Sequence, residues 1–416
     1  MDPIELDTNG QEERLLNHQD NNIEIARDID VTVEVQLEQP LQQDPVSHEF
    51  LSLVSLQVTI NSKALAIFLV LFGHTLNSLN FSASIPVFGP IVYPLFRLAT
   101  AGVGVFAFLS GYGLTKSEEK SGLDGFFVKR FSTVYIPFFL TVVCYNALFK
   151  NVFHSMQTFK NLLKMLVLFS DPTNPLDGTL WFIPFICGWY ILFFIVFKIF
   201  KNRHVRVIVM FIIGIAGYVV FCYHNFGNWQ MPGLYGNQML QIPIGVLFAT
   251  YEKSRFIQKY LKDKRVGLPV LFIHTAVFVF VYWKYIYLDP WGRNMKQQNF
   301  NNIVLTGMNI LFGLWVPFFF TFFVKNANRV MDFIGNHSYE AYLIEGILLS
   351  SPFTQSQPEN AIIFFITVFA CAYAFKKVYQ VVIKYFVLGA NRVTEKVSGI
   401  YDALKTRFNT KAYSRL

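Results

Sequence analysis

Apolar runs of roughly twenty residues alternate with short polar segments along most of this chain. A helix of about twenty apolar residues is long enough to cross the hydrocarbon core of a bilayer. The pattern therefore predicts an all-α fold, a polytopic membrane helix bundle with about ten transmembrane helices. The predicted spans lie near residues 63–80, 96–115, 133–150, 180–198, 206–223, 237–252, 266–287, 303–324, 338–353 and 361–385.

The two ends of the chain depart from this pattern. Residues 1–50 are rich in Gln, Asn, Asp and Glu and show no sustained hydrophobic period. Such a segment buries too little apolar surface to offset the entropy lost on ordering. We therefore predict a disordered polar N-terminal tail over residues 1–50, a transmembrane domain over 51–390 and a basic cytoplasmic C-terminal tail over 391–416.

Composition and charge agree with a membrane protein and exclude a nucleic-acid partner. Of the 416 residues, 53% are hydrophobic and 15% are charged, against about 25% charged in ordinary soluble domains. The formal charge of +8 arises from basic residues in short loops, which the positive-inside rule assigns to the cytoplasm. This distribution favours ten spans with both termini cytoplasmic. The four cysteines lie inside apolar runs at no metal-like spacing, so neither disulfides nor a metal site are predicted.

One histidine lies inside the first apolar run, KALAIFLVLFGHTLNSLN. An ionisable group in hydrocarbon costs roughly 2.5 kcal/mol or more, so His74 is a candidate functional residue. Lys63 precedes it by eleven residues, which on a helix is about three turns and roughly 16 Å. Asn77 follows three residues later and shares that helix face. The first span therefore presents a cation toward one membrane surface and an imidazole toward the bilayer interior.

Two further clusters combine apolar sequence with polar groups. Residues 102–117 (GVGVFAFLSGYGLTKS) contain small residues that let helices approach closely, and Ser110 adds a hydroxyl to that face. Residues 126–139 (FFVKRFSTVYIPFF) open with the adjacent cations Lys129 and Arg130. Basic residues at such a boundary are usually topology anchors. They are also the residues that bind phosphate groups, and the sequence leaves both roles open.

Three other residues are candidates for a binding site. Trp181 opens GTLWFIPFICGWY, where an aromatic belt anchor is the alternative role. Arg97 begins the second span, where the alternative is a side chain that extends to the outer interface. Glu345, in IGNHSYEAYLIEG, lies deep in a late span, where a carboxylate is hard to explain by structure alone.

Taken in chain order, these clusters resemble the acyltransferase-3 family of membrane O-acyltransferases. Members carry a basic residue and then a histidine on the first span, a glycine-rich LSG segment, a basic motif before a proline, an LWF segment and a late serine–tyrosine motif. The matching segments here are Lys63 with LVLFGHT, then GVGVFAFLSG, FFVKRFSTVYIP, LWFIP and GNHSYEAYLIE, over roughly residues 60–350.

This chain departs from the family pattern at three positions. Lys63 stands where arginine is common, which is a mild change. Thr133 lies near the place of the third cation of the basic motif, so the donor-phosphate site loses a charge. Glu345 replaces the late histidine, which indicates a different acceptor or a rearranged proton path.

The resemblance implies transfer of an acyl group, often acetyl, from acyl-CoA (acetyl-CoA) to a hydroxyl of a glycan or lipid acceptor. An imidazole with an unperturbed pKa near 6.5 suits removal of a hydroxyl proton, so His74 is the expected general base or acyl relay. Donor binding would fall to Lys63, Ser110, Lys129 and Arg130, and acceptor binding to Asn77, Arg97, Trp181 and Glu345.

Two other functions remain open. A proton-coupled transporter or exporter of a lipid or saccharide would use His74 and Glu345 to gate or couple movement. A non-catalytic relative would keep the fold while losing chemistry, as the changes at Thr133 and Glu345 allow. Consumption of acyl-CoA distinguishes the enzyme from both.

Overall fold

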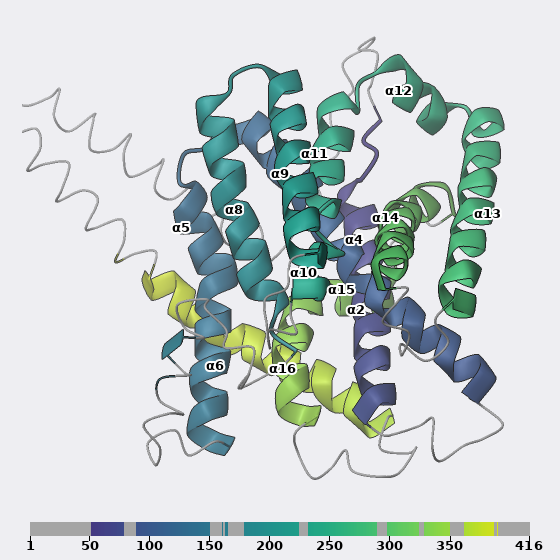
Figure 1. Cartoon of the computed structure of the whole chain (residues 1–416). Coiled ribbons are helices and arrows are strands. Elements are labelled where there is room, and N and C mark those ends of the chain that lie inside the picture. Colours follow the sequence, from purple (N-terminus) through teal and green to yellow (C-terminus); the bar gives the residue numbers. More distant parts are fainter. Residues whose placement is uncertain are drawn as a thin grey trace, which may run out of the picture. The chain divides into compact units, whose positions relative to one another are not determined.

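The computed structural model describes residues 51–78, 89–149, 160, 163–164, 179–223, 232–288, 298–323, 328–349, 362–386 and 389. The two predicted tails lie outside the described residues. Within the described ranges every regular element is a helix, which confirms the all-α prediction (Figure 1).

The described helices follow one another along the chain as separate rods and short broken segments (Figure 1). They are α2 (Leu56–Ser78), α4 (Gly89–Ser121), α5 (Phe126–Arg130), the π-helix η1 (Phe131–Tyr135), α6 (Ile136–Phe149), α8 (Phe182–Ile199), α9 (Arg203–Tyr223), α10 (Pro232–Gly236), α11 (Gln241–Tyr251), α12 (Arg255–Lys262), α13 (Lys264–Leu288), α14 (Gln298–Phe323), α15 (Arg329–Asn336) and α16 (Ser338–Leu349). A last helix, Ile362–Phe386, is called the C-terminal helix below.

Seven stretches of the described residues are helical, long enough and apolar enough to cross a membrane, which supports an integral membrane protein. Each corresponds to one of the predicted spans. Two other predicted spans contain helices that are shorter than expected, since α11 has 11 residues and α16 has 12. At 1.5 Å per residue neither crosses about 30 Å of hydrocarbon alone. Both are largely buried among other helices, where broken backbone is tolerated in a membrane.

Helix α4 lies between α2, α11 and α14 and contacts all three (Figure 1). Its glycines make these contacts close. A Cβ atom at Gly102 would lie 2.8 Å from the carbonyl oxygen of Ala66 on α2. A Cβ atom at Gly111 would collide with the carbonyl oxygen of Ile242 on α11. Small residues therefore set the spacing of the helices that carry the candidate site.

Replacing Gly111 with alanine is expected to destabilise the bundle by about 1–3 kcal/mol, because the new methyl group overpacks the contact with α11. Thermal unfolding of the purified protein in detergent measures the effect. Gly113→Ala is the matched control, since its Cβ would meet nothing within 4 Å. Because alanine is about 1 kcal/mol better than glycine in a helix, this control should unfold at the same or a higher temperature. Equal unfolding temperatures for the two variants would contradict the described packing.

The segment before α2 is fixed by a buried carboxylate at the end of α11. Glu252 accepts a hydrogen bond of 2.5 Å from the Leu53 N–H and pairs with Lys116 Nζ of α4 at 2.7 Å. Gln258 of α12 bonds both the N–H and the C=O of Leu51, at 3.1 and 2.9 Å. These contacts hold the start of α2 in register with α4 and α12, and so set the depth of the residues that α2 carries.

Candidate active site

The histidine of the first span contacts the carboxylate of the late motif. His74 Nδ1 on α2 lies 3.0 Å from Glu345 Oε2 on α16. The Glu345 side chain is completely buried, whereas 35% of the His74 side chain is exposed. A distance of 271 residues in sequence separates the two. The sequence identified both residues and assigned them to different parts of the site, because no local spacing reports a contact between distant helices.

This contact defines what the imidazole can do. When Glu345 is ionised, its carboxylate only accepts hydrogen bonds, and Nδ1 then carries the proton toward it. Nε2 then holds the lone pair and is the nitrogen that can take a proton or attack a carbonyl carbon. The carboxylate also stabilises the ring when it becomes positively charged, as in other histidine–carboxylate pairs. The geometry is that of a general base oriented by a second group.

Two tyrosines of α16 hold this helix in place. Tyr339 donates a hydrogen bond of 2.6 Å to the backbone oxygen of Val134 in η1. Tyr342 donates one of 2.5 Å to the backbone oxygen of Thr179 and accepts one of 3.2 Å from the Phe182 N–H. Both side chains belong to the SYEAYLIE segment that carries Glu345. The motif therefore positions its carboxylate through contacts with two other segments.

Helix α15 fixes the approach of α16 to α2. Gly335 leaves no room for a side chain, because a Cβ atom there would collide with the carbonyl oxygen of Ile60. Gln57 on α2 donates a hydrogen bond of 2.6 Å to Asp332 on α15. The glycine at the start of the late motif thus lets α15 lie directly on α2, and α16 continues from there toward His74.

The two adjacent cations before η1 have different environments. Lys129 is exposed, and Arg130 is partly buried. The guanidinium carbon of Arg130 lies 5.5 Å from the centre of the Tyr190 ring on α8. The π-helical turn at residues 131–135 follows directly, and such turns are common at functional sites. The structure therefore places Arg130 against Tyr190, which the sequence did not single out.

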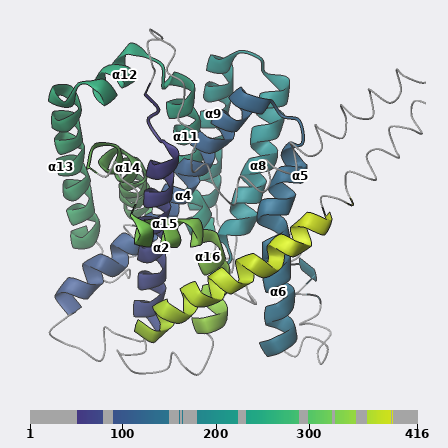
Figure 2. The same cartoon turned by 180° about the vertical axis from the view of Figure 1, so that it is seen from behind.

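Lys63 lies within electrostatic range of Arg130, Glu340 and Lys376. Two of the predicted donor-binding residues, Lys63 and Arg130, thus belong to one charged region. Glu340 is buried in α16, and Lys376 is on the C-terminal helix. Figure 2 shows that helix, in yellow, running across α16. A basic region and the His74–Glu345 pair therefore lie at two levels of the same helix, α2.

The comparison with protein families gives one match, in which the model of the acyltransferase-3 family, an acyltransferase domain, covers residues 61–376. The chain belongs to the acyltransferase-3 family. This confirms the family predicted from the motifs, and the match extends past residue 350 into the C-terminal helix. The comparisons with curated proteins and with solved structures found no match. Family membership and the apolar helices identify an integral membrane protein with an acyltransferase domain.

The remaining predicted residues of this acyltransferase-3 protein have different positions. Trp181 is partly buried in an aromatic cluster, with its ring centre 5.9 Å from that of Tyr235 and 6.3 Å from that of Phe185. The structure describes the helical backbone at Asn77 and Arg97 and not their side chains, so their acceptor roles stay predictions.

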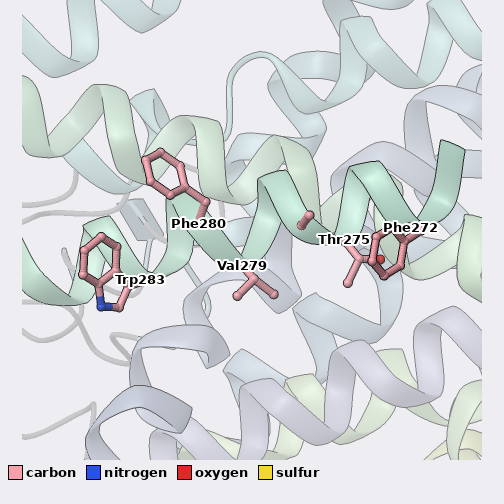
Figure 3. Close-up of a pocket in the computed structure, with 6 residues that line it drawn as sticks. Phe272, Thr275, Val279, Phe280 and Trp283 are labelled. Atoms are coloured by element: carbon pink, nitrogen blue, oxygen red, sulfur yellow. The ribbon is translucent and has the colours of Figure 1, made fainter. Parts of the chain in front are cut away.

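One surface hollow of this acyltransferase-3 protein lies away from these groups. It follows a single face of α13 and contains no ionisable side chain (Figure 3). Phe272, Val279 and Trp283 on that face are all exposed. An apolar and exposed helix face is what a lipid-facing surface requires, so we do not assign substrate to this hollow. Its lining residues are Phe272, Thr275, Ala276, Val279, Phe280 and Trp283.

Proposed function

We propose that this protein is a membrane-embedded O-acyltransferase that moves an acyl group, acetyl in the simplest case, from acyl-CoA to a hydroxyl of a carbohydrate or lipid acceptor. One observation carries the proposal: in a chain of this family, His74 Nδ1 lies 3.0 Å from the buried carboxylate of Glu345. A histidine held in this way is suited to general-base chemistry.

In the proposed reaction, Nε2 of His74 accepts the proton of the acceptor hydroxyl as its oxygen attacks the thioester carbonyl. Glu345 stabilises the imidazolium that forms. The C–S bond then breaks, and His74 returns the proton to the departing thiolate, which leaves as free CoA. A relay in which Nε2 first takes the acyl group and then passes it to the acceptor uses the same two residues. Both routes end with an O-acyl ester and a free thiol.

Donor orientation follows from the positions on α2. Lys63 and His74 are eleven residues apart, roughly 16 Å along the helix. In this proposal Lys63 and Arg130 hold the phosphate end of the donor, and its extended pantetheine arm brings the thioester to His74. With the N-terminus cytoplasmic, as the positive-inside rule favours, Lys63 lies on the cytoplasmic side, where acyl-CoA is available.

The buried His74–Glu345 pair also supports a second candidate, a transporter of a lipid or saccharide. Ionisable pairs inside membrane proteins commonly carry protons between two sides. In that case substrate crosses the bilayer while the thioester stays intact. The two candidates therefore make opposite predictions about free CoA.

The test uses proteoliposomes that contain the full-length protein, with acetyl-CoA labelled in its acetyl group and a native lipid and glycan extract as acceptor. The acyltransferase releases free CoA and labels one of the two fractions. Empty liposomes give the background. Absence of both signals from a folded protein, with longer acyl donors also silent, would contradict the enzyme and favour the transporter.

A further inference from the structure

Basic residues from two other helices lie within electrostatic range of Lys63 on α2. They are Arg130 of α5 and Lys376 of the C-terminal helix. Thr133 stands where the resemblance to the family implies a third cation, and its hydroxyl donates a hydrogen bond of 2.7 Å to the Lys129 backbone oxygen. The charge that is missing from one helix is thus present on another.

Arg130 indicates that this region takes an anion. Its guanidinium lies over two aromatic rings, 5.7 Å from the centre of Phe126 and 5.5 Å from that of Tyr190. Its Nε atom is buried and has no hydrogen-bond partner among the residues that the structure describes. A buried N–H of a charged group without an acceptor is costly, so the atom points to a ligand that supplies an oxygen. The forked guanidinium suits a phosphate group.

Lys376 is held in place at this region. Its Nζ donates a hydrogen bond of 2.6 Å to the backbone oxygen of Asn336, the last residue of α15. A cation is favourable at a helix C-terminus, and an ammonium group has three N–H donors, of which this bond uses one. The contact keeps the charge at the junction of α15 and α16, close enough to act on Lys63.

The acidic and titratable neighbours leave this region positive. Glu340 is the carboxylate that acts on Lys63, and it accepts a hydrogen bond from the Tyr379 hydroxyl. Burial lowers the pKa of His337 below its ordinary value, against a hydrogen bond to the Phe333 backbone oxygen that acts in the opposite direction. His337 is therefore neutral at neutral pH. Among the described residues that act on Lys63, the basic groups outnumber the one carboxylate, which suits a negatively charged phosphate group.

We propose that Lys376 is the third cation of the phosphate-binding site for acyl-CoA, in place of the charge that Thr133 does not supply. The site then consists of Lys63, Arg130 and Lys376, and the exposed Lys129 is not part of it. This inference rests on the proposed function, because it takes acyl-CoA as the donor. It assigns to the C-terminal helix a direct part in donor binding.

The test measures binding of acetyl-CoA to the purified full-length protein by calorimetry at low and high salt. Lys376→Gln should weaken binding by about tenfold, with a smaller dependence on salt, because one charged phosphate contact is lost. Lys377→Gln is the matched control, since it removes the same charge from the next residue and should bind as the wild type does. Lys376→Arg should restore most of the affinity.

A second measurement needs no variant and so does not depend on how a variant folds. Bound acetyl-CoA should protect Lys376 of the wild type from reductive methylation, read by mass spectrometry, and leave Lys377 as reactive as before. Wild-type binding with equal affinity in Lys376→Gln and Lys377→Gln, or with no selective protection of Lys376, overturns this inference alone. A folded wild type that binds no acyl-CoA overturns the proposed function together with it.

Discussion

Replacing His74 with alanine is expected to lower acyl transfer by about 10²–10⁴-fold, the usual contribution of a positioned general base. The variant keeps Lys63 and Arg130, the proposed donor-binding residues, so its affinity for acetyl-CoA should stay near that of the wild type. Release of free CoA and incorporation of labelled acetyl, measured in proteoliposomes at matched protein amounts, give the comparison.

The control for this prediction is His274→Ala. His274 is also a histidine on an apolar helix, α13, where its Nε2 lies 2.9 Å from the backbone oxygen of Leu311. It lies far along the chain from the proposed chemistry and should leave turnover within a few-fold of the wild type. Full activity of a folded His74→Ala variant would remove His74 from the mechanism.

Replacing Glu345 with glutamine is expected to lower turnover by about 10–100-fold, the usual cost of losing the group that orients a functional histidine. The amide still fits the space and can still accept a hydrogen bond from Nδ1. It cannot stabilise the imidazolium that forms when His74 takes a proton. The rate of CoA release measures the effect.

The KM for acetyl-CoA should change little in Glu345→Gln, which separates a role at His74 from a general loss of structure. Glu119→Gln is a suitable control, because Glu119 is an exposed carboxylate that pairs with Lys116 at 2.9 Å, away from α16. A Glu345→Gln variant with a raised KM and an unchanged kcat would place Glu345 in substrate binding. If instead it abolished substrate movement without any thioester cleavage in the wild type, the transporter would be the better description.

The sequence was sufficient for some of the site. Because helical spacing is regular, Lys63 and His74 could be placed on one helix from their separation alone. The depth of Glu345 in an apolar run was enough to mark it as functional. Its partner could not be predicted, because the contact depends on how α15 lies against α2 at Gly335.

Other features of the candidate site and of the fold could be established only from the tertiary structure. Lys129 and Arg130 are adjacent in sequence, so no hydrophobic periodicity could show which of the two is exposed and which is partly buried. The packing of Arg130 against the aromatic ring of Tyr190 makes that difference. Hydropathy predicted full spans at residues 237–252 and 338–353, where α11 and α16 are short helices. The average hydropathy of such a segment stays apolar even when it contains buried polar residues, so it does not reveal where the helix ends. Lys376 lies inside the predicted span 361–385 with no local pattern around it that indicates a role, and its contact with Asn336 is what distinguishes it.

Helix α16 contributes one carboxylate to the basic region and one to the contact with His74. Glu340 and Glu345 are on this one helix, about 7.5 Å apart along its axis. Glu340 acts on Lys63 in the basic region, and Glu345 holds His74. Both carboxylates are on one helix of 12 residues, so a displacement of α16 would alter the surroundings of Lys63 and the distance between Glu345 and the imidazole together. Donor binding and the orientation of His74, as proposed, would then be coupled through this one helix.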